Sequence, residues 1–332
     1  MIKRVIEKVK GFIYKVLYYL TGNNIIKKTQ WYRNLFVDYD YQIYPGNIWY
    51  REHDERNFDI VALGSSSAKW AFDFENTNVK GMNWANQPQT LQEDYNLLRH
   101  YHSILHKGSY VLITIMPFSG LNKATGLKDA LKYVRLDYQG EAIQPYMYEE
   151  ACRYARIPIL FGRPAVKALV RYVLRKESKN DISPLGQGAN NPMTKEQLEE
   201  NALGFINGWK EQFQIADFDA PLTPLNQEGR DYRIHLMREL IDFCIERDYK
   251  PVYIIPPVTN SLSSYFTPTF EKRYVYDFLE QVERDILLLD YSKDTDLKRD
   301  NLYFNSFFLN KKGASLFTKR VLKDLNLEKF KC

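Results

Sequence analysis

The stretch that decides the fold is DIVALGSSSA, residues 59 to 68. Its first part is a short apolar run typical of a buried strand, after which Gly64 and three serines lead into a helical pattern. Such a turn exposes a hydroxyl group and backbone N–H groups at the carboxyl end of the strand, where the start of the next helix favours an oxyanion. Serines also cap helices, so the turn indicates a site only together with further motifs.

Short apolar runs alternate with helical patterns around this stretch. Strands are expected at 58–63, 81–85, 110–116, 251–255 and 287–291, and helices at 91–105, 234–245, 270–286 and 313–325. This alternation predicts βαβ units and a mainly parallel sheet in one α/β domain over residues 50–330. It fails at about 120–229, which we interpret as a helical insertion. Because ligands bind beyond the carboxyl ends of parallel strands, an insertion after the third strand is placed to cover the site.

The composition excludes several classes of protein. The chain has 332 residues, 45% of them apolar and 26% charged, which is typical of a globular protein. The net charge of +5 resides mostly in the first 28 residues, so a nucleic-acid-binding surface is not expected. Three distant cysteines form no CxxC pair, which favours a reducing cytoplasm over a disulfide framework or a zinc site. No cofactor or metal motif is present, so none is expected.

Residues 1–30 have the apolar spacing of a basic amphipathic helix. Its basic residues interrupt the apolar face too often for a membrane-spanning helix, and no cleavage site for a signal peptide follows. Two interpretations stay open: the helix lies on the anionic inner face of a membrane, or it packs on its own domain. The candidate membrane-facing residues are Lys3, Arg4, Lys8 and Lys15. A basic stretch at 153–176 is interpreted either as a solvated basic helix face or as a second surface, facing a membrane or an anionic ligand, that acts with the N-terminal helix.

A second motif near the C-terminus is NLYFNSFFLNKKGA, residues 301 to 314. Together with the serine turn it resembles the SGNH (GDSL-like) hydrolase superfamily, in particular the branch with GSS-type turns that includes acyl esterases and acyltransferases of bacterial surface polymers. The last block of that family commonly reads D-x-x-H-L-N-x-x-G-A, and MNWAN at 82–86 resembles its second block. The resemblance covers about 59–121 and 231–325. It implies a three-layer α/β/α, flavodoxin-like domain with a five-stranded parallel sheet in the order 2-1-3-4-5.

The resemblance also places the catalytic positions. It puts the nucleophile at Ser66, the catalytic Asp at Asn305 and the catalytic His at Phe308. Phenylalanine cannot accept a proton, and in serine hydrolases the loss of the base costs on the order of 10⁶ in kcat. The asparagine that the family uses for the oxyanion is also missing, because the third strand leads into TIMPFS at 114–119. The remaining oxyanion or binding candidates are Ser65, Ser67, Asn86 and Gln87.

Other residues are considered as a replacement base. The histidines are His53, His100, His102, His106 and His235, and none follows the fifth strand, where the family has its base. His53 is the best placed, because it precedes the first strand. The carboxylates after the first two strands, Asp73, Glu75, Glu93 and Asp94, are expected to be helix N-terminal and surface charges.

Three functions therefore remain open. The first is a degenerate SGNH-like protein that binds an acyl or carbohydrate ligand and assists the acylation or assembly of a bacterial surface polysaccharide. The second is an active ester hydrolase or O-acyltransferase that uses Ser66 with an unconventional base. The third is a membrane-associated interaction module with a filled pocket. Packing of Phe307 and Phe308 into the former site favours the third, and an open polar pocket beside Ser66 contradicts it.

Overall fold

The computed structural model describes residues 12, 23–29, 31–32, 57–75, 77–86, 89–121, 130–131, 148–175 and 193–327. Its centre is a five-stranded sheet in which all paired strands are parallel, in the order β2-β1-β3-β4-β5. The strands are β1 (Phe58–Leu63), β2 (Gly81–Asn83), β3 (Leu105–Thr114), β4 (Lys250–Ile255) and β5 (Leu287–Asp290). The predicted fold class and strand order are thus confirmed.

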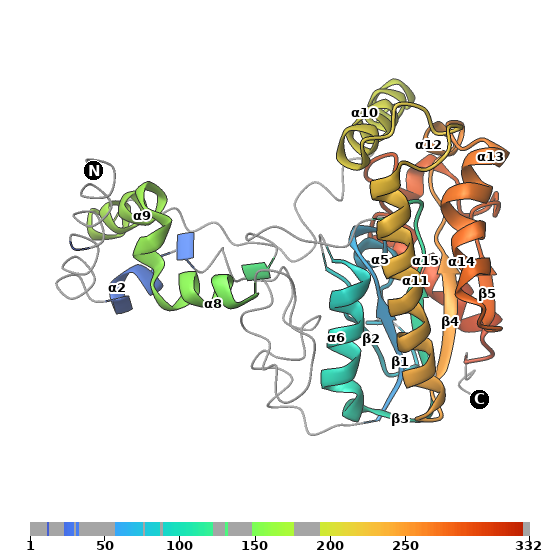
Figure 1. Cartoon of the computed structure of the whole chain (residues 1–332), viewed down its shortest axis with the longest axis horizontal. Helices are drawn as coiled ribbons and strands as arrows, with labels where there is room; N and C mark the ends of the chain where they lie inside the picture. Colours follow the sequence, from blue (N-terminus) through green and yellow to red (C-terminus); the bar gives the residue numbers. More distant parts are fainter. Residues whose placement is uncertain are drawn as a thin grey trace.

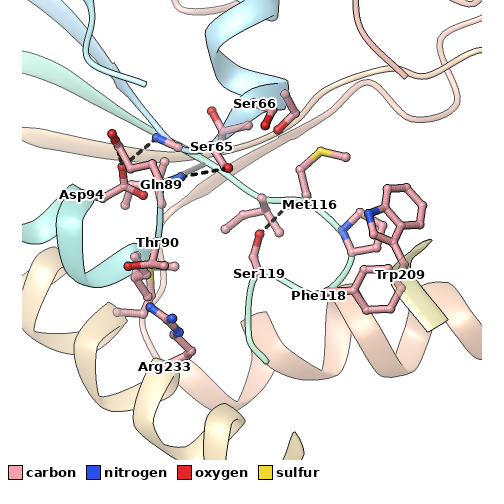
Figure 2. A pocket seen from close by; sticks show the side chains of 18 of the residues that line it. Ser65, Ser66, Gln89, Thr90, Asp94, Met116, Phe118, Ser119, Trp209 and Arg233 are labelled. Carbon is pink, nitrogen blue, oxygen red and sulfur yellow. Dashed lines mark hydrogen bonds between the residues drawn. The ribbon is translucent and has the colours of Figure 1, made fainter. Parts of the chain in front are cut away.

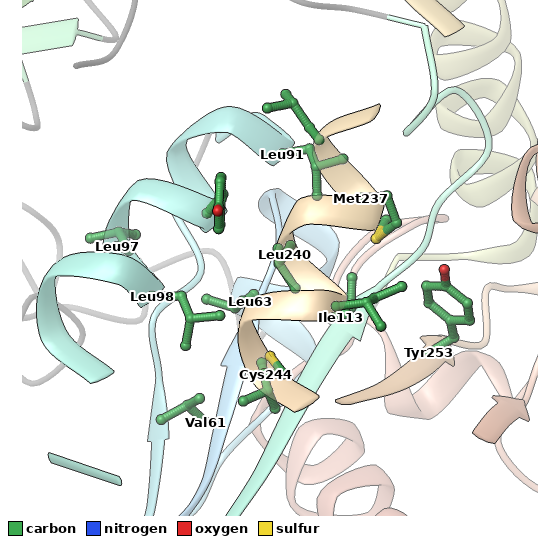
Figure 3. Packing of buried hydrophobic residues seen from close by; sticks show 14 of the residues in the cluster. Val61, Leu63, Leu91, Leu97, Leu98, Ile113, Met237, Leu240, Cys244 and Tyr253 are labelled. Carbon is green, nitrogen blue, oxygen red and sulfur yellow. The ribbon is translucent and has the colours of Figure 1, made fainter. Parts of the chain in front are cut away.

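Helices cover both faces of the sheet (Figure 1). On one face, α6 (Leu91–Tyr101) and α11 (Pro224–Ile245) bury leucines against Val61 and Leu63 of β1 (Figure 3). On the other face, α5 (Ser66–Ala71) and α15 (Lys311–Asp324) pack against Ile60 and Ala62. Successive strand residues point to opposite faces, so β1 contributes to both layers of the core. The result is a three-layer α/β/α domain.

Capping residues fix where the main helices begin. Thr90 and Glu93 form a capping box at the start of α6, and Thr223 caps α11 with Pro224 in its first turn. Asn310 caps α15 by accepting a hydrogen bond from the Gly313 N–H. These groups satisfy backbone N–H donors that have no partner inside the helix.

Several element boundaries differ from those predicted. Helix α11 begins ten residues before the predicted start at 234 and so extends into the expected insertion. Strand β3 begins at Leu105, where a continued helix was predicted. The predicted helix at 270–286 consists of α13 (Pro268–Glu271), the π-helical turn η3 (Lys272–Tyr276) and α14 (Asp277–Val282).

The described part of the insertion contains α8 (Tyr148–Arg156), the 3₁₀ turn η2 (Pro158–Phe161), α9 (Arg163–Val173) and α10 (Lys195–Phe213). Helix α10 lies at the carboxyl ends of the strands beside α12 (Asn260–Ser263), and its Ala202 and Ile206 share an apolar cluster with Phe118. Helices α8 and α9 lie apart from the sheet together with α2 (Asn23–Lys27) (Figure 1).

Helix α2 is part of the segment predicted as an N-terminal amphipathic helix. Its Ile26 is buried against Ile159 and Ala165 of the insertion. The end of this segment therefore packs within the protein, whereas Lys3, Arg4, Lys8 and Lys15 lie outside the described residues. None of the described helices has the length and apolar content that a membrane crossing requires.

Candidate functional site

A cavity of about 460 Å³ lies at the carboxyl ends of β1 and β3, where α10 and α11 meet the sheet (Figure 2). Its lining includes Gly64, Ser65, Ser66, Ser67, Gln89, Thr90, Asp94, Thr114, Met116, Phe118, Ser119, Trp209, Gln212, Phe213, Arg233, Met237 and Phe307. This is the sheet edge at which ligands bind in open α/β folds. Helix α10 contributes Trp209, Gln212 and Phe213 to the wall.

The serine turn forms one wall of the cavity. Gly64 has a φ of 139°, and a Cβ there would lie 2.8 Å from the Ala68 Cβ and 2.9 Å from the Thr114 Cβ, so only glycine fits. The Ser65 hydroxyl accepts a hydrogen bond of 3.2 Å from the Gln89 N–H (Figure 2). The Ser66 hydroxyl has no hydrogen-bond partner in the part of the chain that the structure describes. The expected nucleophile thus lines the cavity, and none of the described side chains forms a hydrogen bond with its hydroxyl group.

Asp94 is buried directly behind this turn. Its Oδ1 accepts a hydrogen bond of 2.8 Å from the Gly64 N–H and another from the Gln89 amide. Burial raises the pKa of Asp94 to about 7, against the effect of these hydrogen bonds. The prediction that Asp94 is a surface charge is therefore wrong, because the first turn of α6 faces the cavity. A carboxyl group that titrates near neutral pH in a cavity is typical of functional sites.

Asn305 and Phe308, which the resemblance places at the catalytic Asp and His positions, both have a structural role here. The Asn305 Oδ1 accepts hydrogen bonds from the N–H groups of Phe307 (2.9 Å) and Phe308 (2.7 Å), which fixes the turn. Phe308 is 8% exposed, and its ring lies 4.6 Å from that of Phe307 and 6.5 Å from that of Trp70. Neither Asn305 nor Phe308 lines the cavity, which stays open beside Ser66. Phe308 thus packs in an aromatic cluster and does not fill the cavity.

The described histidine side chains lie elsewhere. His102 contacts the Tyr249 hydroxyl at 3.1 Å, and His106 pairs with Asp59 near the amino end of β1. His235 pairs with Glu239 on the exposed side of α11. None of these three lines the cavity. His53 and the side chain of His100 are outside the described residues, so a role of His53 as the replacement base stays a prediction.

The oxyanion or binding candidates from the sequence lie in different places. Ser65 and Ser67 line the cavity, whereas Asn86 is buried and absent from its lining. Gln87 lies outside the described residues. Gln89, which sequence reasoning missed, follows in the same loop and connects Ser65 to Asp94. Its position only two residues beyond Gln87 could have identified it as a further candidate.

Arg233 is a second residue that sequence reasoning missed. Its side chain is 1% exposed and lines the cavity from α11. Burial lowers its pKa to about 10, so the guanidinium still carries its charge at neutral pH. Its spacing in the sequence could have indicated this burial. Arg233 precedes the buried Met237 and Leu240 by four and seven residues and so shares their helix face.

Phe118 forms the aromatic wall of the cavity. Its φ is 74°, an uncommon backbone conformation for an aromatic residue. Its ring lies 4.9 Å from that of Phe213 and 5.4 Å from that of Trp209. Backbone conformations of this kind persist where packing enforces them, and they cluster at ligand sites.

Among the described residues no group of three or more His, Cys, Asp or Glu side chains is arranged to bind a metal ion. No protein-family model matches this chain, and no curated protein is similar to it in sequence. The resemblance to SGNH hydrolases consequently rests on the sequence blocks at 59–68, 82–86 and 301–314.

Proposed function

We propose that this protein is a degenerate SGNH-like protein that binds a small ligand at the serine turn without serine-hydrolase catalysis. One observation supports this above all: an open cavity of about 460 Å³ lies beside Ser66, while Phe308 packs into an aromatic cluster at the position of the base. An open cavity favours binding over a purely structural role, and the missing base disfavours acyl transfer through Ser66.

The lining favours a ligand with both polar and apolar parts. Serine hydroxyls and Gln89 form the polar wall, and Phe118 and Trp209 form the apolar wall. Acyl chains pack on such aromatic surfaces, and sugar rings combine hydroxyl groups with apolar faces. An acyl or carbohydrate ligand therefore fits the proposal. By analogy with the resembled branch, the protein would assist acylation or assembly of a bacterial surface polysaccharide.

The test of inactivity is intact-mass analysis after exposure to a fluorophosphonate probe, with the native chain and Ser66→Ala side by side. We expect no adduct on either protein, while an active serine hydrolase in the same reaction is labelled fully. A single adduct that Ser66→Ala lacks would instead support the alternative of an active ester hydrolase or O-acyltransferase. Asp94 would then be the first residue to test as the unconventional base, because burial raises its pKa to about 7.

A second function, peripheral membrane binding, is supported by the exposed face of α9. Val166, Val170 and Val173 are 40%, 50% and 66% exposed and share one helix face by their spacing. Basic side chains lie beside this face at Arg163, Lys167 and Arg171. An apolar stripe bordered by cations is typical of helices that lie on anionic lipid.

Co-sedimentation with phosphatidylcholine vesicles, with and without phosphatidylglycerol, tests this binding. We expect the full chain to bind only the anionic vesicles, and the double variant Val170→Asp with Val173→Asp to lose binding. Leu203→Asp, at an exposed leucine on α10, is the control and should bind like the native chain. Equal binding of the native chain and the double variant would contradict a role for α9.

A further inference from the structure

Arg233 is a buried cation that has no hydrogen-bond partner among the residues that the structure describes. Its Nε, Nη1 and Nη2 atoms all lack one, although the side chain is 1% exposed. The side chain comes from α11 and lies beside Thr90 at the edge of the cavity (Figure 2). Buried polar groups in proteins are nearly always hydrogen-bonded, and an unpaired buried charge is especially unfavourable. This guanidinium therefore indicates a partner that enters through the cavity.

The neighbouring carboxylates do not fill this role. Glu93 and Asp94 attract Arg233 through space, but neither forms a hydrogen bond or an ion pair with it. The Glu93 carboxylate accepts hydrogen bonds from the backbone and hydroxyl of Thr90, which hold it at the helix cap. The Asp94 Oδ1 accepts from Gly64 and Gln89 on the serine side. The N–H donors of Arg233 thus remain available.

We propose that Arg233 binds an oxyanion, a carboxylate or a phosphate, of the ligand that occupies this cavity. The inference rests on the proposed binding function and specifies its ligand class. A guanidinium presents its donors in a planar fork that matches both oxyanions with two parallel hydrogen bonds. Trp209, Phe213 and Met237 line the same cavity and provide apolar contact. The ligand is then an organic anion whose charged group faces α11 and whose apolar body packs toward α10.

The test uses the full chain labelled with 5-fluorotryptophan and read by ¹⁹F NMR. Trp209 lines the cavity and is assigned by Trp209→Phe. Trp31, whose ring packs on Phe161 in the helical group away from the sheet, is an internal control. The probes are phenyl phosphate, benzoate and the neutral benzyl alcohol, titrated at constant ionic strength. We expect both anions to shift the Trp209 signal saturably, to leave Trp31 unchanged, and to bind more tightly than benzyl alcohol.

Variants of Arg233 separate recognition of the ligand's charge from apolar binding in the cavity. Arg233→Gln should weaken phenyl phosphate and benzoate binding at least about tenfold and leave benzyl alcohol binding unchanged. The affinity of Arg233→Lys for the two anions should lie between those of the native chain and Arg233→Gln, because lysine keeps the charge but lacks the planar fork of donors. Arg238→Gln is the matched control on the same helix, where the native side chain contacts Glu283 outside the cavity. It should bind all three probes like the native chain.

Three results would overturn the inference. If the anions bind the native chain no more tightly than benzyl alcohol, the cavity binds ligands but Arg233 does not select an anion. This comparison uses only the native chain, so it is valid even if Arg233→Gln fails to fold. If the anions bind Arg233→Gln as tightly as the native chain, another group recognises them. If none of the three probes shifts Trp209, the proposed binding function fails as well.

Discussion

Replacing Asp94 by asparagine should change how the stability of the protein depends on pH. Burial raises the pKa of this carboxyl group from 3.8 to about 7 in the folded protein. Asparagine keeps the oxygen that accepts hydrogen bonds from Gly64 and Gln89 but cannot ionise. The substitution therefore removes the cost of burying a carboxylate and leaves the local geometry in place.

The sign and size of this pH dependence follow from the difference between the pKa values of Asp94 in the folded and unfolded states. Because the folded pKa lies above the unfolded one, the protonated carboxyl group favours folding at low pH, and this contribution is lost as the pH rises from about 4 to about 7. Each pKa unit corresponds to about 1.4 kcal/mol, so the full loss is about 4 kcal/mol. About 3 kcal/mol of it falls between pH 5 and pH 8. The negative charge of Glu93 also raises the pKa of Asp94, whereas the positive charge of Arg233 lowers it.

Urea unfolding followed by tryptophan fluorescence at several values between pH 5 and pH 8 measures the effect. The stability of Asp94→Asn relative to the native chain should rise by about 3 kcal/mol over this interval. Asp231→Asn, at an exposed position on α11, is the control and should show a constant difference. If the difference for Asp94→Asn is also constant, Asp94 is ionised throughout and its burial does not control its protonation.

Three further substitutions test packing and helix capping in the α/β domain by urea unfolding. Phe118→Ala should destabilise by about 3 kcal/mol, because it removes a ring that is 4% exposed at the centre of an aromatic cluster. Gly229→Ala should cost about 3 kcal/mol or more, because the new Cβ would lie 1.9 Å from the Leu121 carbonyl oxygen, whereas Gly208→Ala in an open part of α10 should not destabilise. Asn310→Ala should cost about 1–2 kcal/mol by removing the cap of α15, and unchanged stability would contradict the capping role.

The sheet could be predicted because its strands are short apolar runs that end at distinct signals. The run at 59–63 ends at Gly64, and the run at 251–255 ends at two prolines. Parallel strands buried on both faces produce such continuous runs, and helices at regular intervals supply the crossovers. The order of the strands followed from the resemblance, and the pairing in the structure agrees with it.

Helix α11 was predicted too short because Gly229 lies in its interior. Glycine disfavours a helix in isolation, yet here the missing side chain lets the helix approach the Leu121 carbonyl oxygen. The cap at Thr223 and the proline after it were the local signals for the true start. Tertiary contact, which periodicity cannot report, decided this boundary.

The cavity was predicted only at its serine wall. Ser65, Ser66 and Ser67 line it together, because the turn after β1 belongs to one local motif. Asp94 and Arg233 come from helices α6 and α11, and a charged residue in a helix is most often on its solvated face. Their burial depends on how these two helices pack on the sheet, which involves residues that are far apart in sequence.

The pairing of β3 with β4 also affects how the chain folds as it is made. Tyr110 pairs with Lys250, about 140 residues later. A ribosome that adds about 5–20 residues per second needs on the order of ten seconds to make the intervening chain. During that interval β1, β2 and β3 are complete, but the open side of β3 presents unpaired N–H and C=O groups that other strands can join. The insertion therefore sets how long the edge of β3 stays unpaired, and so open to aggregation, while the chain is made.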